Sequence, residues 1–145
     1  MTEPGRYDGG CVCGAIRFTS MSDPQRVTVC HCLWCQRRTG SAFGTEVVFF
    51  KQDIVQSGTV TAAHYRHFSD VSGRWLDMYF CATCGTNLGF ELEAVPDIRT
   101  LPAGIFDQAD WIDPARIPTR QVFARSRRNW GDVMQGVDVY EEHFR

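Results

Sequence analysis

The sequence predicts a mainly β fold of folded-over antiparallel sheets, stabilised by zinc and with very little helix. The first observation behind this prediction is a series of short runs that alternate apolar and polar residues or are rich in β-branched side chains. The second is that turn signals such as Ser22-Asp23-Pro24 and Ser72-Gly73 separate these runs. The third is the number of cysteines, seven in 145 residues, which lie in close clusters.

Eight segments have strand character. In chain order they are residues 15–19, 26–30, 43–50, 60–68, 75–80, 87–92, 98–105 and 120–125. Two short helices are expected, one at 35–39 and one at 126–133. Because no linker or repeat divides the chain, we expect a single domain over residues 1–145. Its core should span about residues 5–133, and the residues after Val137 should form a loosely held C-terminal tail.

Charge and hydropathy narrow the functional class. The formal net charge of −2 gives no general reason to expect a nucleic-acid or membrane surface. The first ten residues lack the basic start and apolar run of a signal peptide, and no stretch approaches the roughly 20 apolar residues of a membrane span. We therefore expect a cytoplasmic protein without nucleic-acid or membrane partners. Thiols stay reduced in that compartment, so clustered cysteines indicate metal binding rather than disulfides.

Two of the cysteine groups together offer four sulfur ligands. Cys11 and Cys13 are two residues apart, so in an extended chain their side chains point the same way. Cys81 and Cys84 have the spacing of a zinc knuckle, in which a tight turn followed by glycine presents two thiolates. The four thiolates add up to the closed tetrahedral site that zinc uses for structure.

Cys30, Cys32 and Cys35 remain as three ligands for a second ion. Catalytic zinc is typically held by three protein ligands, and water or substrate occupies the fourth position. Three free core cysteines are an alternative, but their spacing makes random placement improbable. An iron–sulfur cluster is another, but the ferredoxin spacings are absent.

The histidines are weaker candidates for the missing ligand. His31 lies between Cys30 and Cys32, so in an extended chain it should face away from both. His64 and His67 are expected in a half-exposed strand, and His143 in the solvated tail. The fourth ligand of the second zinc is therefore expected to come from the substrate.

Three motifs carry a family resemblance. The segments GGCVCGAIRF, CHCLWCQRRTGSAF and YFCATCGTNLGF, in this order, resemble the glutathione-dependent formaldehyde-activating enzyme family, which shares its domain with centromere protein V. The later segment IFDQADWIDPARIPTRQVFARSRRNW is similar to the C-terminal pattern of that family. Two positions depart from it: Gln121 stands where histidine is common, and Arg127 stands where lysine is usual.

The resemblance implies a β-tent fold and a zinc-dependent carbon–sulfur lyase acting on thiol–aldehyde adducts. It implies that the structural zinc is held by Cys11, Cys13, Cys81 and Cys84. It also implies that Cys30, Cys32 and Cys35 hold a second zinc, whose remaining position accepts a glutathione thiolate. The expected partners are a small-molecule thiol, glutathione or a relative, and an aldehyde such as formaldehyde.

Two arginines follow the second cluster directly. Arg37 or Arg38 could orient a thiol substrate through a bidentate contact with its carboxylate. The alternative is that one of them offsets the anionic cysteine cage or faces solvent. Trp34 could cover the open site, or it could belong to the core.

A zinc-stabilised binding module is the competing functional class. In that case Arg125, Arg127 and Arg128 would mark a patch for a nucleic acid or a protein partner. The net charge of −2 and the lack of alternating aromatic and basic residues argue against it.

Overall fold

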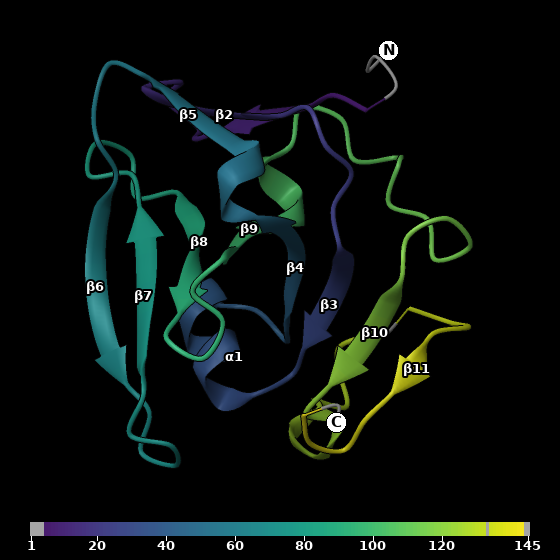
Figure 1. The fold of residues 1–145 in the computed structure, drawn as a ribbon. Helices are drawn as coiled ribbons and strands as arrows, with labels where there is room; N and C mark the ends of the chain where they lie inside the picture. Colours follow the sequence, from purple (N-terminus) through teal and green to yellow (C-terminus); the bar gives the residue numbers. More distant parts are fainter. Residues whose placement is uncertain (1–4, 133, 144–145) are drawn as a thin grey trace.

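Two β-sheets and one α-helix make up the described part of the chain. The computed structural model describes residues 5–132 and 134–143 (Figure 1). The mainly β fold with little helix is confirmed. Within the described residues, no helix has the length and apolar character needed to cross a lipid bilayer.

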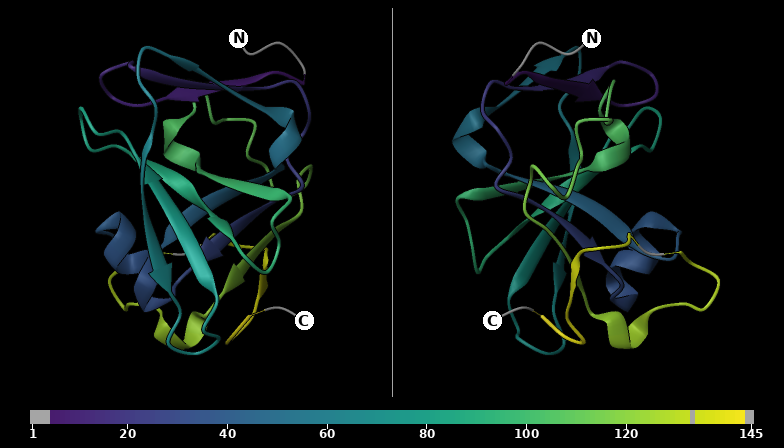
Figure 2. Two further views of the ribbon diagram at one scale, coloured as in Figure 1. Left: turned by 60° about the vertical axis from the view of Figure 1, so that its left-hand side comes forward. Right: turned by 90° about the vertical axis from the view of Figure 1, so that its right-hand side faces the viewer.

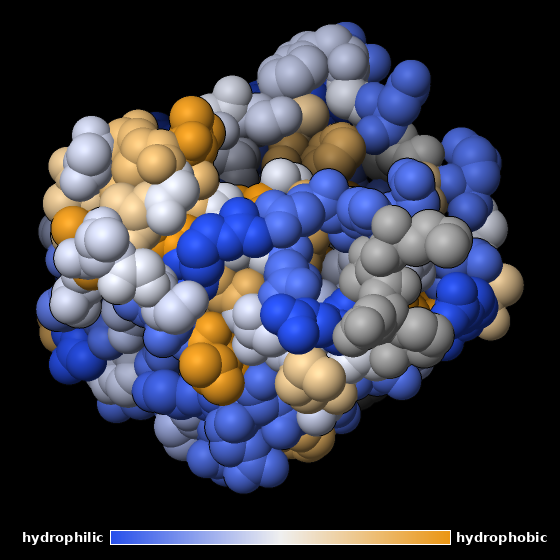
Figure 3. Space-filling view, turned by 90° about the horizontal axis from the view of Figure 1, so that it is seen from above, coloured by the Kyte–Doolittle hydropathy of each residue, from blue (hydrophilic) through white to orange (hydrophobic). Residues whose placement is uncertain are grey.

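The smaller sheet has three antiparallel strands in the order β1-β2-β5: β1 (Tyr7–Gly10), β2 (Ile16–Ser20) and β5 (Ile54–Gly58). Strands β1 and β5 were not predicted. Figure 3 looks onto the end of the molecule that carries this sheet and shows hydrophilic residues over one part of the face and apolar residues over another. Two strongly exposed apolar residues, Val12 and Val55, belong to the β1–β2 turn and to β5.

The larger sheet has the strand order β11-β10-β3-β4-β9-β8-β7-β6. Its strands are β3 (Arg26–Cys30), β4 (Gly44–Phe50), β6 (Ala63–Phe68), β7 (Trp75–Phe80), β8 (Asn87–Leu92), β9 (Ile98–Pro102), β10 (Thr119–Val122) and β11 (Asp138–Val139).

Most neighbouring strands of the larger sheet are antiparallel, as predicted. At one edge the prediction is wrong, because β10 runs parallel to both β3 and β11. The chain leaves β9, crosses over through residues 103–118, and enters β10 in the direction of β3.

The larger sheet folds over between β8 and β9. These strands meet at a single registered pair, Phe90 with Thr100, and β6–β8 turn away from β3, β4 and β10 (Figures 1 and 2). Gly89 allows the close approach, because its backbone has a φ of 80°. A Cβ atom at this position would overlap the carbonyl oxygen of Thr100, so only glycine fits. The prediction of folded-over sheets is thus confirmed.

The main core is assembled from both sheets. Alternate residues of β2, such as Ile16 and Phe18, face inward, as expected for a strand with one buried side. They pack with Phe49 of β4, Leu88 of β8 and Leu101 of β9. A second, smaller cluster surrounds the only α-helix of the described chain, α1 (Leu33–Thr39).

The C-terminal segment corrects two predictions. Residues 127–132 are not helical; only a 3₁₀ turn, η3 (Ala124–Ser126), forms, and Val133 lies outside the described residues. Just before this segment, the backbone N–H groups of Phe123 and Ala124 donate to the carbonyls of Glu142 and Tyr140. The expected loose tail is therefore held in place, since β11 also pairs with β10.

Candidate metal centres

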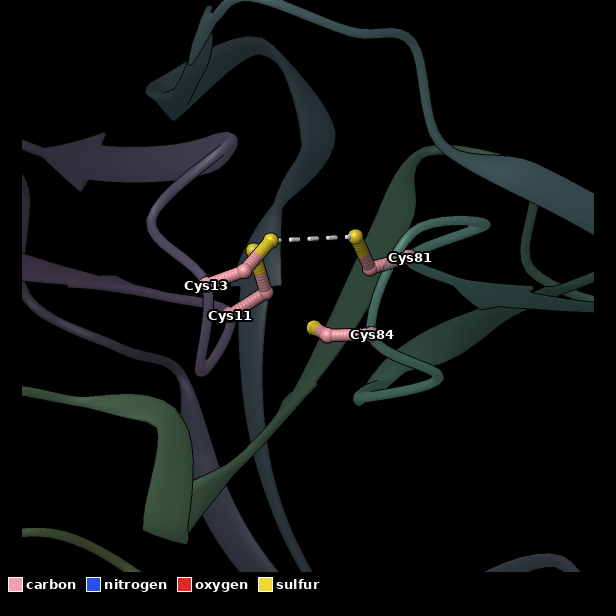
Figure 4. Close-up of side chains that lie close together, drawn as sticks. All are labelled: Cys11, Cys13, Cys81 and Cys84. Carbon is pink, nitrogen blue, oxygen red and sulfur yellow. Dashed lines mark hydrogen bonds between the residues drawn. The ribbon is translucent and has the colours of Figure 1, made fainter.

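Four cysteine sulfurs from two distant turns converge between the sheets. Cys11 and Cys13 lie in the β1–β2 turn, and Cys81 and Cys84 lie in the β7–β8 turn (Figure 4). The Sγ atoms of Cys11 and Cys13 are 3.6 Å apart, and those of Cys13 and Cys81 are 3.8 Å apart. All four sulfurs lie within 4.8 Å of one another.

These sulfur distances suit a tetrahedral zinc ion. A Zn–S bond of about 2.3 Å in a tetrahedron places neighbouring sulfurs about 3.8 Å apart. In the β7–β8 turn, Gly85 has a φ of 77°, and its N–H donates to the carbonyl of Cys81 at 2.7 Å. In the other turn the N–H of Ile16 donates to Cys11 Sγ at 3.3 Å. The residues present therefore fit a closed Cys₄ metal site.

The hydroxyl of Thr86 contacts both turns that carry the four cysteines. Its Oγ1 accepts a hydrogen bond from the N–H of Val12 at 3.1 Å, which links the two turns directly. The same hydroxyl lies 3.1 Å from Cys84 Sγ and lowers the pKa of Cys84 to about 5. A thiol that ionises this readily is suited to bind a metal ion.

The second cluster is built from a strand end and a helix start. Cys30 is the last residue of β3, Cys32 caps the N-terminus of α1, and Cys35 lies within the helix. The N–H of Cys35 donates to Cys32 Sγ at 3.3 Å. The three sulfurs lie within 4.8 Å of one another; Cys30 and Cys35 are buried, and Cys32 is partly exposed. The helix lies at the end of the molecule away from the smaller sheet (Figure 1).

The donor chemistry of this cluster also fits a cation. Hydrogen bonds from the thiols of Cys30 and Cys35 lower the pKa of Cys32 to about 3. The same hydrogen bonds among the three thiols raise the pKa of Cys30 to about 12 and the pKa of Cys35 well above its ordinary value. One thiol thus ionises at the expense of the other two, and a bound cation is what allows all three to act as thiolates.

His31 takes no place in the second cluster. Its side chain is fully buried, its Nε2 lies 3.0 Å from Oε1 of Gln121, and its ring packs edge-on against Phe43. It therefore points away from the sulfurs, as its position between two cysteines led us to expect. His64 is exposed and His67 half-buried in β6, which agrees with the predicted half-exposed strand.

The two arginines after the cluster have different environments. Arg37 is exposed on α1, whereas the side chain of Arg38 is only 1% exposed and forms an ion pair with the equally buried Glu46 of β4. Burial raises the pKa of Glu46, although Arg38 opposes this shift. That either arginine binds a substrate carboxylate stays a prediction. The sequence analysis did not single out Glu46; the available signal was an acidic residue directly before the apolar run VVFF.

Aromatic rings and the C-terminal segment surround the cluster. Trp34 is half-buried, packs edge-on against Phe90 and stacks on His67, with ring centroids 5.2 Å and 6.1 Å apart. Phe123 and Tyr140 pack against the small cluster formed by Cys30, Cys35 and Val122. Trp34 is thus partly buried beside the cluster, and that it covers the open site stays a prediction.

Two of the three arginines proposed for a binding patch are engaged within the chain. Arg125 forms an ion pair with Glu142 at 2.9 Å. Arg128 donates from Nε to Oε1 of Gln36 at 2.6 Å, and Gln36 in turn donates to the carbonyl of His31. The Arg128 contact ties the C-terminal segment to α1, so both arginines have an internal role.

The fold and the two clusters define a mainly β protein with two cysteine-rich candidate metal centres. A family model described as glutathione-dependent formaldehyde-activating enzyme matches residues 6–126, and the chain belongs to this family. A crystal structure of a Rhodobacter sphaeroides protein from a structural genomics programme has the same fold, with a TM-score of 0.57 at 15% identity. The match covers 92% of this chain and 98% of that one. No curated protein matches the sequence.

Proposed function

We propose that this protein is a zinc-dependent carbon–sulfur lyase-type enzyme acting on thiol–aldehyde adducts. Its thiol is glutathione or another small thiol, and its aldehyde is formaldehyde or a close relative. The observation that carries the proposal is the difference in sulfur count between two clusters of one chain, four in one and three in the other. Membership of the glutathione-dependent formaldehyde-activating enzyme family supports the choice of chemistry.

The reaction is a reversible addition. The thiolate sulfur forms a bond to the aldehyde carbon, the π electron pair of the carbonyl moves to oxygen, and that oxygen takes up the proton that the thiol lost. The product is an S-hydroxymethyl thioether. The reverse reaction breaks the carbon–sulfur bond and returns the aldehyde and the thiol.

The chain would contribute ligands and orientation. Cys30, Cys32 and Cys35 would hold the second zinc and leave one position open, while the closed cluster would hold the first zinc for structure. When bound, the second zinc supplies the positive charge that keeps a substrate thiol deprotonated at neutral pH. Arg37, being exposed on α1, is the arginine better placed to meet a substrate carboxylate. Holding both reactants in one geometry supplies much of the acceleration.

Exchange spectroscopy tests this function. We expect the metal-loaded chain to accelerate the interconversion of ¹³C-formaldehyde and S-hydroxymethylglutathione above the spontaneous rate, as measured by NMR. The variant Cys35→Ser, checked for native circular dichroism, should show only the spontaneous rate. If glutathione and other small thiols all exchange at the rate seen without protein, the proposed activity is wrong.

Thermal stability provides a second, independent readout. Glutathione should raise the melting temperature of the metal-loaded chain, because a ligand that binds only the folded state stabilises it. S-methylglutathione, which keeps the carboxylates but has no free thiol, is the matched control and should raise it much less. Equal shifts with both compounds would mean that the sulfur is not the anchoring group.

A further inference from the structure

The ion pair between Arg38 and Glu46 is buried more deeply than a stability role explains. The exposed fractions of the two side chains are 1% and 2%. Removing both charges from water has a large desolvation cost, and replacing such a pair by apolar residues is often neutral or stabilising. The presence of the pair next to a candidate metal centre therefore points to a function for its geometry.

The surroundings of the pair hold it in one arrangement. The guanidinium carbon of Arg38 lies 4.7 Å from the centroid of the Phe90 ring and 5.2 Å from that of Trp34. Gly44 also lies so close to the pair that a Cβ atom there would overlap Oε1 of Glu46. Rings and backbone thus limit how far either side chain can move.

The pair also contacts the three-cysteine cluster. The atom Nη2 of Arg38, which binds Glu46, lies 3.9 Å from Sγ of Cys35. One guanidinium nitrogen thus contacts both a carboxylate and a cysteine sulfur, while the planar group as a whole lies against the rings of Trp34 and Phe90. The compact ammonium group of lysine does not reproduce this ring contact. A ligand that accepts such a contact is held in a defined rotamer, and groups of this kind outside the metal ligands commonly set metal affinity.

We infer that Arg38, oriented by Glu46, is a positioning residue for Cys35 in the open metal centre. This inference rests on the proposed function of that centre. The carboxylate of Glu46 balances the charge of the guanidinium, so what Arg38 gives the centre is a positioned N–H group facing Sγ of Cys35, which fixes the direction of that ligand. The neighbouring arginines then have separate tasks: Arg38 supports the metal ligand, and Arg37 faces outward.

The test compares variants by their affinity for the second metal ion, measured without any thiol substrate. Arg38→Met fills the space between the rings but donates no hydrogen bond, and it is combined with Glu46→Gln so that no lone charge stays buried. Arg37→Met makes the same chemical change at the exposed neighbour and is the matched control. Arg38→Lys keeps the positive charge but lacks the planar group that lies against the rings of Trp34 and Phe90.

We expect the double variant to bind the more weakly held zinc about 10–100-fold less tightly, as competition with a chromophoric chelator reports. The thiolate charge-transfer bands of the Co²⁺-loaded second site should shift as well. Arg37→Met should bind the second zinc ion as tightly as the unmodified chain, and Arg38→Lys should bind it with intermediate affinity. The affinity of the first site should not change in any variant.

An unchanged second affinity and an unchanged cobalt spectrum in a folded double variant would contradict the inference, leaving the pair with a packing role. If the double variant does not fold, Arg38→Lys alone gives the test, because it keeps both charges of the buried pair. A several-fold weaker second site is then expected, and an unchanged one contradicts the inference. If the unmodified chain takes up only one metal ion, the proposed function itself is wrong.

Discussion

Single residues determine whether the two halves of the larger sheet can approach as closely as they do. Gly89 is the clearest case, since its backbone has a left-handed φ of 80° and lies against the carbonyl of Thr100. Gly73 also has a left-handed φ, of 71°, but a Cβ atom there would meet nothing within 4 Å. Replacing Gly73 therefore reports the cost of the left-handed backbone alone, whereas replacing Gly89 adds the cost of the close contact with Thr100.

Gly89→Ala should lower the stability of the metal-loaded protein much more than Gly73→Ala. We expect about 1 kcal/mol for Gly73→Ala, the conformational cost alone. For Gly89→Ala we expect at least about 2–3 kcal/mol, because the new Cβ also forces the backbones of β8 and β9 apart. Melting curves followed by circular dichroism give the comparison. Equal shifts in melting temperature would mean that the β8–β9 contact adapts freely.

The elements differ in how well their sequences predict them. Strands β3, β7 and β8 have the predicted bounds. β3 and β8 alternate polar or small residues with apolar ones, and β7 is a short run rich in aromatic residues. β1 is YDGG, too short and glycine-rich for any period, and β5 has only one partly buried residue, so neither carries the signal. The segment 126–132 lacks apolar residues at helical spacing, and side-chain contacts hold it to α1: Gln36 donates to the carbonyl of Ser126, and Arg128 donates to Gln36.

In the candidate site too, local sequence patterns predict some features, whereas tertiary contacts determine others. The two cysteine clusters were predictable because local spacing, together with glycine at the turns of the first, brings the sulfurs of each motif together. The ion pair of Arg38 with Glu46 was not, since it depends on how α1 packs against β4. The αL backbone of Phe123, at a φ of 56°, likewise follows from tertiary contacts and has no marker in the sequence. Non-glycine residues rarely adopt this conformation, so the sequence gives no reason to expect it.

The two turns that carry the closed cluster should be far more sensitive to mutation than α1. Cys13 and Cys81 are 68 positions apart, so a metal ion between them closes a long loop and joins the two sheets. We expect Cys84→Ser to destabilise the fold by several kcal/mol, giving aggregated or unfolded protein. Cys35→Ser removes a ligand from a cluster confined to residues 30–35, so it should leave a folded domain with one zinc.

Circular dichroism and metal analysis of the two purified variants provide the measurement. The substitution is chemically identical in both, so each serves as the control for the other. Should Cys35→Ser unfold the chain as completely as Cys84→Ser, the second metal would be structural too, and the open position would be a wrong interpretation.

At the scale of the whole molecule, the fold separates two cysteine clusters. One lies where the smaller sheet meets the β7–β8 turn, and the other lies beside α1 at the end away from the smaller sheet (Figures 1 and 4). A closed site at the junction of the sheets can hold the fold together while an open site elsewhere exchanges its ligand. We propose above all that the second site has a fourth position whose only sulfur ligand is an external thiol.

X-ray absorption at the zinc edge tests that claim most directly. With two zinc ions bound and no thiol added, we expect an average of about 3.5 sulfur ligands per zinc, the mean of a four-sulfur and a three-sulfur site. Saturating glutathione should raise the average to about four, whereas S-methylglutathione should leave it unchanged. An average of four before any thiol is added, or no increase with glutathione, would contradict the open position and the chemistry built on it.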